Sequence, residues 1–104
     1  KGCGMTDKYI LDGKTPVPAD LMTWARWFES ARDERIVAKT DIAASRVSTV
    51  FLGVDHQYGE GPPLLFETMI FEGPKDSETW RCSTWEEAEK QHEEAVEVAR
   101  KALV

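Results

Sequence analysis

The sequence is poor in cysteine, in positive charge and in long hydrophobic runs. Two cysteines in 104 residues are too few for a disulfide scaffold. No apolar stretch reaches the length of a membrane span, so we expect no membrane partner. Thirteen basic side chains against nineteen acidic ones give a formal net charge of −6. Because an acidic surface repels phosphate backbones, we also expect no general nucleic-acid binding.

The composition is that of one folded domain, with 41% hydrophobic and 31% charged residues. We expect residues 1–4, which precede Met5, to be a cloning scar, and residues 5–104 to form a single domain. Without the scar, Cys82 is the remaining thiol, which fits a reducing compartment. We find no secretory leader, so the expected location is the cytoplasm.

The first part of the chain carries signals for a strand and a helix. Tyr9–Leu11 is a short apolar run that ends in a turn at Asp12-Gly13. Pro16 and Pro18 suit the first turn of a helix, because the N–H that proline lacks has no partner there. Apolar residues at helical spacing then predict a helix over about residues 18–31.

The middle of the chain is predicted to be β-structure. Apolar and polar residues alternate over 36–42, as in a half-buried strand. Residues 46–54 are rich in Val, Thr and Phe, and the apolar run 64–71 lies between turn-forming residues. Trp80–Cys82 is expected to add a short fifth strand.

The last segment is predicted to be a helix. Two overlapping capping boxes, Ser83 with Glu86 and Thr84 with Glu87, open it. His92 lies on its apolar stripe, where a hydrogen-bonded core histidine is more common than a ligand. We expect Cys82 to be a small buried or half-buried residue rather than a nucleophile.

These elements predict an α+β fold. Their order is strand, helix, three strands, a short strand, helix, and short connections favour antiparallel pairing. We expect a four- to five-stranded, mainly antiparallel sheet with two helices packed on one face.

The two central strands carry apolar side chains on both sides. Two short helices can cover one face of such a sheet but not both. A second copy of the chain is the simplest cover for the other face, and loops folding over it are the alternative. We therefore expect a homodimer, with Phe51, Leu65, Met69 and Phe71 at the interface.

The connection over residues 53–63, GVDHQYGEGPP, is the candidate binding loop. A plain hairpin needs about two to five loop residues, and this one is about twice as long. Glu67 lies mid-strand among apolar residues and needs a partner, for which Arg46, Arg35 or Lys39 are candidates. The candidate binding residues are Asp55, His56, Tyr58, Glu60 and Glu67.

Three interpretations of this loop remain open. His56 could be a general base oriented by Asp55 or Glu67. Asp55 and His56, with Glu60 or Glu67, could bind a divalent metal. The segment could also be an ordered surface loop, with glycines for positive φ and prolines for rigidity. No catalytic, metal or phosphate-binding motif occurs in the sequence, so the catalytic residues are unknown and no metal or cofactor is expected.

Several strings resemble a family of small uncharacterised proteins of phages, prophages and mobile elements, including gene cassettes. They are YILDGKTPVP from Tyr9, WARWFE from Trp24, RVSTVFLGVDH from Arg46, GPPLLFETM from Gly61 and STWEEAE from Ser83. The resemblance covers nearly the whole chain. It implies a mobile genetic setting but no activity and no catalytic residue.

Two functions from different classes follow. The first is a small accessory protein of a phage or mobile element that acts by binding a protein or small ligand, as a homodimer and with a host or phage protein as a possible partner. The second is a small enzyme or metal-binding protein with Asp55, His56 and Glu67 in one cleft.

Overall fold

The computed structural model describes residues 7–57 and 59–102. The expected cloning scar and Tyr58 lie outside the described residues. The elements are β1 (Tyr9–Asp12), β2 (Thr15–Pro18), α1 (Leu21–Ser30), the 3₁₀ turn η1 (Asp33–Arg35), β3 (Ile36–Ile42), β4 (Ser45–Phe51), β5 (Phe66–Phe71), β6 (Thr79–Cys82) and α2 (Trp85–Lys101).

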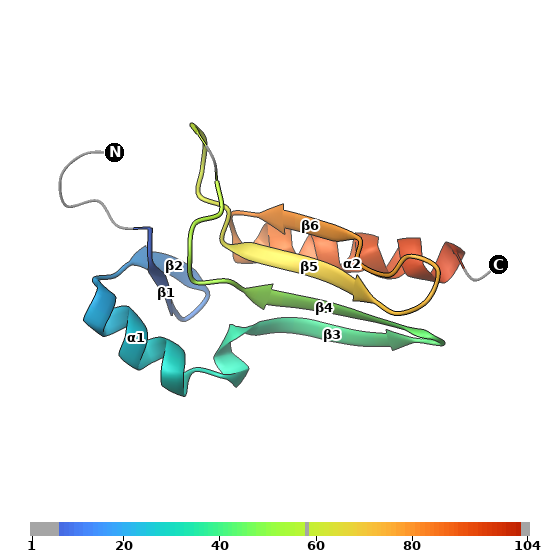
Figure 1. Cartoon of the computed structure of the whole chain (residues 1–104), viewed down its shortest axis with the longest axis horizontal. Helices are drawn as coiled ribbons and strands as arrows, with labels where there is room; N and C mark the ends of the chain where they lie inside the picture. Colours follow the sequence, from blue (N-terminus) through green and yellow to red (C-terminus); the bar gives the residue numbers. More distant parts are fainter. Residues whose placement is uncertain (1–6, 58, 103–104) are drawn as a thin grey trace.

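The fold is α+β, as the sequence predicts. β1 and β2 form a two-stranded antiparallel sheet, and a second antiparallel sheet has the order β3-β4-β5-β6 (Figure 1). α2 lies across one face of the larger sheet and contacts all four of its strands. α1 lies beside the β1–β2 hairpin at one end of the molecule, where the Trp27 ring meets the Phe51 ring edge-on at 5.7 Å. Among the described residues, no helix is long and apolar enough to cross a membrane.

The second strand was not expected from the sequence. Pro16 and Pro18 lie in β2, not in the first turn of α1. The Tyr9 N–H donates to the Gly53 carbonyl at 2.8 Å and so points away from β2. Pro18, which lies opposite Tyr9, therefore needs no N–H of its own.

α1 begins three residues later than predicted, at Leu21. The Asp20 carboxylate caps it by accepting the Thr23 N–H at 2.8 Å, and this bond lowers the pKa of Asp20. At α2 the capping box formed by Thr84 and Glu87 is the one that is made, with Thr84 Oγ1 accepting the Glu87 N–H at 3.1 Å.

The core lies between the sheet and α2. Alternate side chains of β4 and β5 are buried there, as the period of two dictates. Small residues on α2 let the helix approach the sheet closely. The residues that meet in this layer are Val47, Thr49 and Phe51 of β4, Phe66, Thr68 and Ile70 of β5, and Ala88, His92, Ala95 and Ala99 of α2.

Gly53 joins the N-terminal elements to the larger sheet. Its φ of +78° is a conformation that favours glycine, and a Cβ there would lie 2.7 Å from the Phe28 ring. Its carbonyl accepts two hydrogen bonds, from the Tyr9 N–H at 2.8 Å and from Trp24 Nε1 at 2.9 Å. The hairpin and α1 are thus both attached at this residue.

Candidate functional site

The carboxylate of Asp55 organises the candidate loop. Its Oδ1 accepts the Gln57 N–H at 2.7 Å and the Leu64 N–H at 3.0 Å. These bonds tie the two ends of the loop together. Glu60 is exposed, and Tyr58 lies outside the described residues. The loop extends beyond the end of the larger sheet (Figure 1).

The His56 ring is held by backbone. Its Nδ1 lies 2.8 Å from the Val54 carbonyl oxygen, which can only accept, so Nδ1 donates. Within residues 7–57 and 59–102, no hydrogen bond joins this ring to Asp55 or Glu67. In the same residues, no group of three or more His, Cys, Asp or Glu side chains could hold a metal ion.

Glu67 has the partner that its position requires, but it is a residue the sequence analysis did not choose. Its Oε2 lies 3.0 Å from both Nε and Nη2 of Arg81, which is directly opposite on β6. Arg46 is bonded instead to Asp41, at 2.9 Å. The Glu67–Arg81 ion pair is partly shielded from solvent, since the Glu67 side chain is 17% exposed.

The face of the larger sheet that points away from α2 is open. We call it the open face. The strand register places three rows of side chains across it: Ile36, Val50, Glu67 and Arg81; Lys39, Ser48, Met69 and Thr79; and Asp41, Arg46 and Phe71. Phe71 is the exposed large apolar side chain here, at 44%.

The charges of the open face balance. Three bases, Lys39, Arg46 and Arg81, stand against Asp41 and Glu67 on the strands and Glu72 at the end of β5. The chain as a whole carries −6. The acidic excess therefore lies on other surfaces, and the open face is a neutral area of an acidic protein.

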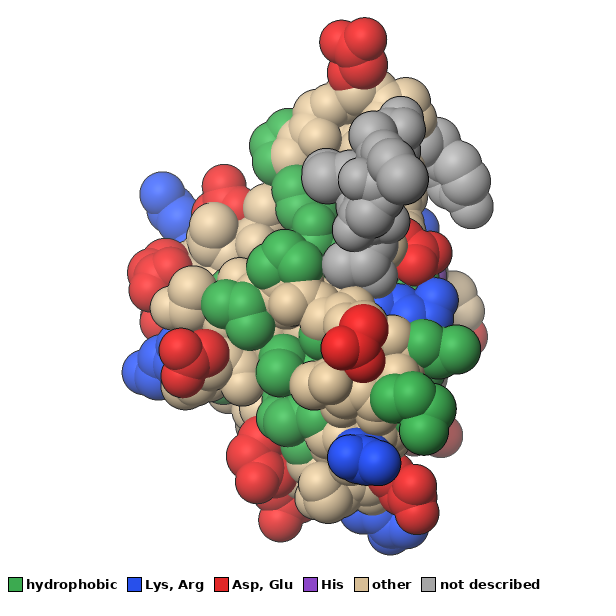
Figure 2. Space-filling model, turned by 90° about the vertical axis from the view of Figure 1, so that its left-hand side faces the viewer, with side chains coloured by type: hydrophobic (Ala, Val, Ile, Leu, Met, Phe, Trp, Pro, Cys, Tyr) green, Lys and Arg blue, Asp and Glu red, His purple; other side chains and the backbone are tan. Residues whose placement is uncertain are grey.

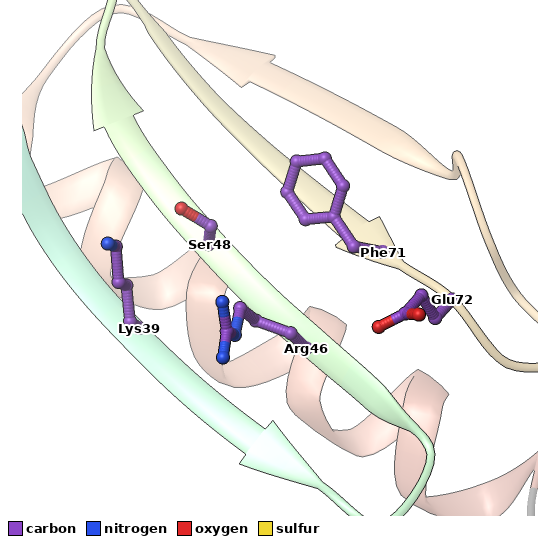
Figure 3. Close-up of a pocket in the computed structure, with 5 residues that line it drawn as sticks. All are labelled: Lys39, Arg46, Ser48, Phe71 and Glu72. Carbon is purple, nitrogen blue, oxygen red and sulfur yellow. The ribbon is translucent and has the colours of Figure 1, made fainter.

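A shallow depression of about 420 Å³ lies on the open face. It is lined by Lys39, Arg46, Ser48, Phe71 and Glu72. Figure 3 shows the two bases on the β3 and β4 side, the Phe71 ring on β5, and the Glu72 carboxylate turned toward Arg46, with α2 behind the sheet. The hydrogen bond from Arg46 to Asp41 raises the pKa of the guanidinium, which is charged at neutral pH without this shift as well.

The sequence analysis did not predict this depression, although it named Lys39, Arg46 and Phe71 for other roles. Arg46, Ser48 and Val50 alternate with the buried residues of β4, and this alternation was the available signal. The four residues predicted for a dimer interface divide between two places. Phe51 and Leu65 lie in the core at 1% exposure, and Met69 and Phe71 lie on the open face.

His92 is a core histidine, as predicted. Its Nδ1 lies 2.8 Å from Thr49 Oγ1 and its Nε2 lies 2.8 Å from Thr40 Oγ1. Burial lowers the pKa of this imidazole. Cys82 is also buried, and burial, with a smaller contribution from Glu87, raises the pKa of its thiol to about 11. Such a thiol is a poor nucleophile.

Apart from the open face, exposed apolar side chains lie at the end of the molecule that carries α1. Leu21 and Met22, in the first turn of α1, are 60% and 63% exposed. Figure 2 shows hydrophobic side chains spread over this end. These side chains do not line the depression on the open face.

The fold and this surface define an α+β protein whose four-stranded antiparallel sheet has one face covered by a helix and one face open. Comparison with protein-family models, with curated proteins and with solved structures gave no match.

Proposed function

We propose that this protein acts by binding a protein partner through the open face of its larger sheet, and that it works as a homodimer. The observation that carries the proposal is the exposed Phe71 ring, set in a depression among charged groups of both signs. An aromatic anchor with a polar rim is typical of protein interfaces.

The candidate loop supports binding over catalysis. The Asp55 carboxylate is engaged with backbone N–H groups, and the His56 ring with a backbone carbonyl. Glu67 is paired with Arg81 on the open face. A general base needs an orienting partner and a proton to abstract within hydrogen-bond reach. These three residues are instead used to hold backbone and neighbouring strands.

The biological setting that we propose is a phage or another mobile element, with the protein acting as an accessory factor in the cytoplasm. The support is the resemblance of the strings quoted above, which span most of the chain. Reading the genes that flank the coding sequence tests this setting. Integrase, capsid or cassette-recombination genes beside it would agree, and a conserved housekeeping operon would contradict it.

The binding surface is tested by site-specific photo-crosslinking in an extract of the native host. A crosslinking amino acid at Ser48, on the open face, should give a discrete adduct, whereas the same group at Glu94 on the exposed side of α2 should not. Phe71→Ser should lower the affinity for the partner by about 2 kcal/mol, roughly 30-fold, and so reduce the yield of the adduct. Equal adducts from both positions, or no effect of Phe71→Ser, would show that the partner does not bind at the open face.

A further inference from the structure

The two edges of the larger sheet are not equivalent. β6, at one edge, has four residues, and the Gln91 side chain of α2 donates to the Arg81 carbonyl there at 3.2 Å. β3, at the other edge, has seven residues, and Figure 1 shows no other described strand or helix running along its outer side. A long edge strand is a template for another strand.

The hydrogen-bond pattern shows which residues of β3 face outward. The Leu52 N–H donates to the Leu65 carbonyl, and this bond continues the β4–β5 register. The backbone N–H and C=O groups of the even-numbered residues of β4 therefore point toward β5. The odd-numbered residues Val47 and Thr49 then bond to Thr40 and Ala38 of β3.

The backbone groups of Lys39 and Asp41 consequently point away from the sheet. Within residues 7–57 and 59–102, no hydrogen bond reaches them from that side. Their side chains lie on the open face, beside Ser48 and Arg46. Asp41 is paired with Arg46, and among the described residues no ion pair involves Lys39.

We propose that two copies of this chain pair antiparallel along β3, so that Lys39 of each copy lies opposite Asp41 of the other and the two sheets become one. The inference rests on the homodimer proposed above and names its interface.

The charges select this register among the alternatives. An antiparallel two-fold pairing must place outward-facing residues opposite each other. Pairing Lys39 with itself, or Asp41 with itself, would oppose like charges. Pairing Lys39 with Asp41 places opposite charges together twice, and each pair exchanges two backbone hydrogen bonds. Thr40 then faces its own copy at the two-fold axis.

The edge is a better contact between copies than the open face. Pairing of two copies across the open face would cover the depression that is proposed above to bind the protein partner. Edge pairing instead leaves both depressions exposed on the same side of the joined sheet. A contact along one seven-residue edge strand buries little surface, so the dimer should be weak and should dissociate on dilution.

Charge exchange tests the interface and its register. We expect wild-type protein to show a concentration-dependent dimer by light scattering and sedimentation, up to the millimolar concentrations used for NMR. Lys39→Glu should weaken the dimer at least 10-fold, and Lys39→Glu combined with Asp41→Lys should restore it. Lys90→Glu, the same charge change on the exposed side of α2, is the matched control and should leave association unchanged. Circular dichroism checks that each variant folds.

The outcomes separate the possible failures. A dimer that tolerates Lys39→Glu but is lost in Phe71→Ser would overturn edge pairing and leave the homodimer standing, across the open face. A double variant that stays monomeric while folded would overturn the register. A wild-type chain that is monomeric at every concentration would overturn both the edge contact and the homodimer.

Discussion

His92 and Thr49 are joined by a hydrogen bond of 2.8 Å between the ring Nδ1 and the threonine Oγ1. The other ring nitrogen meets the Thr40 hydroxyl, and Thr49 in turn meets the Thr68 hydroxyl at 2.7 Å. A neutral imidazole offers one donor and one acceptor, which two hydroxyls can match. One side chain of α2 is therefore tied to three strands of the sheet.

We predict that this arrangement makes stability depend on pH. Burial holds the pKa of His92 below its ordinary value of 6.5 in the folded chain. Below pH 6.5 the unfolded chain therefore binds a proton that the folded chain does not. The contribution is complete above pH 6.5 and is lost as pH falls from 6.5 toward the folded pKa. Denaturant unfolding across this range should show the free energy of unfolding falling with pH.

The matched controls use the two histidines of the chain. His92→Gln should lower the free energy of unfolding at pH 8 by about 2 kcal/mol, because buried hydrogen bonds are lost, and should flatten its dependence on pH. His56→Gln, in the loop, should keep the wild-type slope. If the slope disappears in His56→Gln instead, the pH dependence comes from His56 and the prediction for His92 is wrong.

A second prediction concerns Gly53. Gly53→Ala should destabilise the fold by about 3 kcal/mol, the sum of a left-handed backbone penalty and displacement of the Phe28 ring. Gly13→Ala is the control: its φ is +65°, but nothing lies within 4 Å of a Cβ there, so the cost should be about 1 kcal/mol. Equal losses at the two positions in urea unfolding would show that the Phe28 contact does not matter.

A third prediction is that Cys82 resists alkylation. A rise in the thiol pKa from 9.0 to about 11 reduces the reactive thiolate at pH 8. The native protein should therefore react with iodoacetamide at least about 100-fold more slowly than the same chain in denaturant. The measurement uses a Cys3→Ser variant so that one thiol remains. Rates within a factor of a few of each other would contradict the burial of this side chain.

The fourth prediction compares two ion pairs by double-mutant cycles. Glu67 and Arg81, partly shielded, should show a coupling of about 1 kcal/mol, from Glu67→Gln, Arg81→Met and the double variant. Asp41 and Arg46 have side chains 74% and 58% exposed, and their coupling should stay below about 0.5 kcal/mol and vanish in high salt. The reverse order of couplings would contradict the burial described here.

Local patterns allowed much of the fold to be predicted. The alternation over 36–42 and the capping box at Thr84 depend on neighbouring residues, and both elements formed as expected. The Pro16–Pro18 segment was misjudged because a fixed φ suits both a helix start and an edge strand. Here the tertiary bond from Tyr9 to Gly53 decides between them.

The residues of the open face could not be predicted from local sequence patterns. Arg81 became the partner of Glu67 through the β5–β6 register, which the sequence alone leaves free. The central strands have apolar residues on both sides, so the pattern could not say which side would meet α2. The helix resolves this, because its alanines and His92 fit the face that carries Thr49 and Thr68.

The doubly bonded carbonyl of Gly53 also bears on how the molecule opens. One oxygen holds both the first strand and the Trp24 indole. Any fluctuation that rotates this peptide breaks both bonds together. The hairpin and α1 should therefore separate from the larger sheet together, and because Leu11 of β1 packs in one core cluster with Phe51, Phe66 and Ala88, this opening also exposes part of the core.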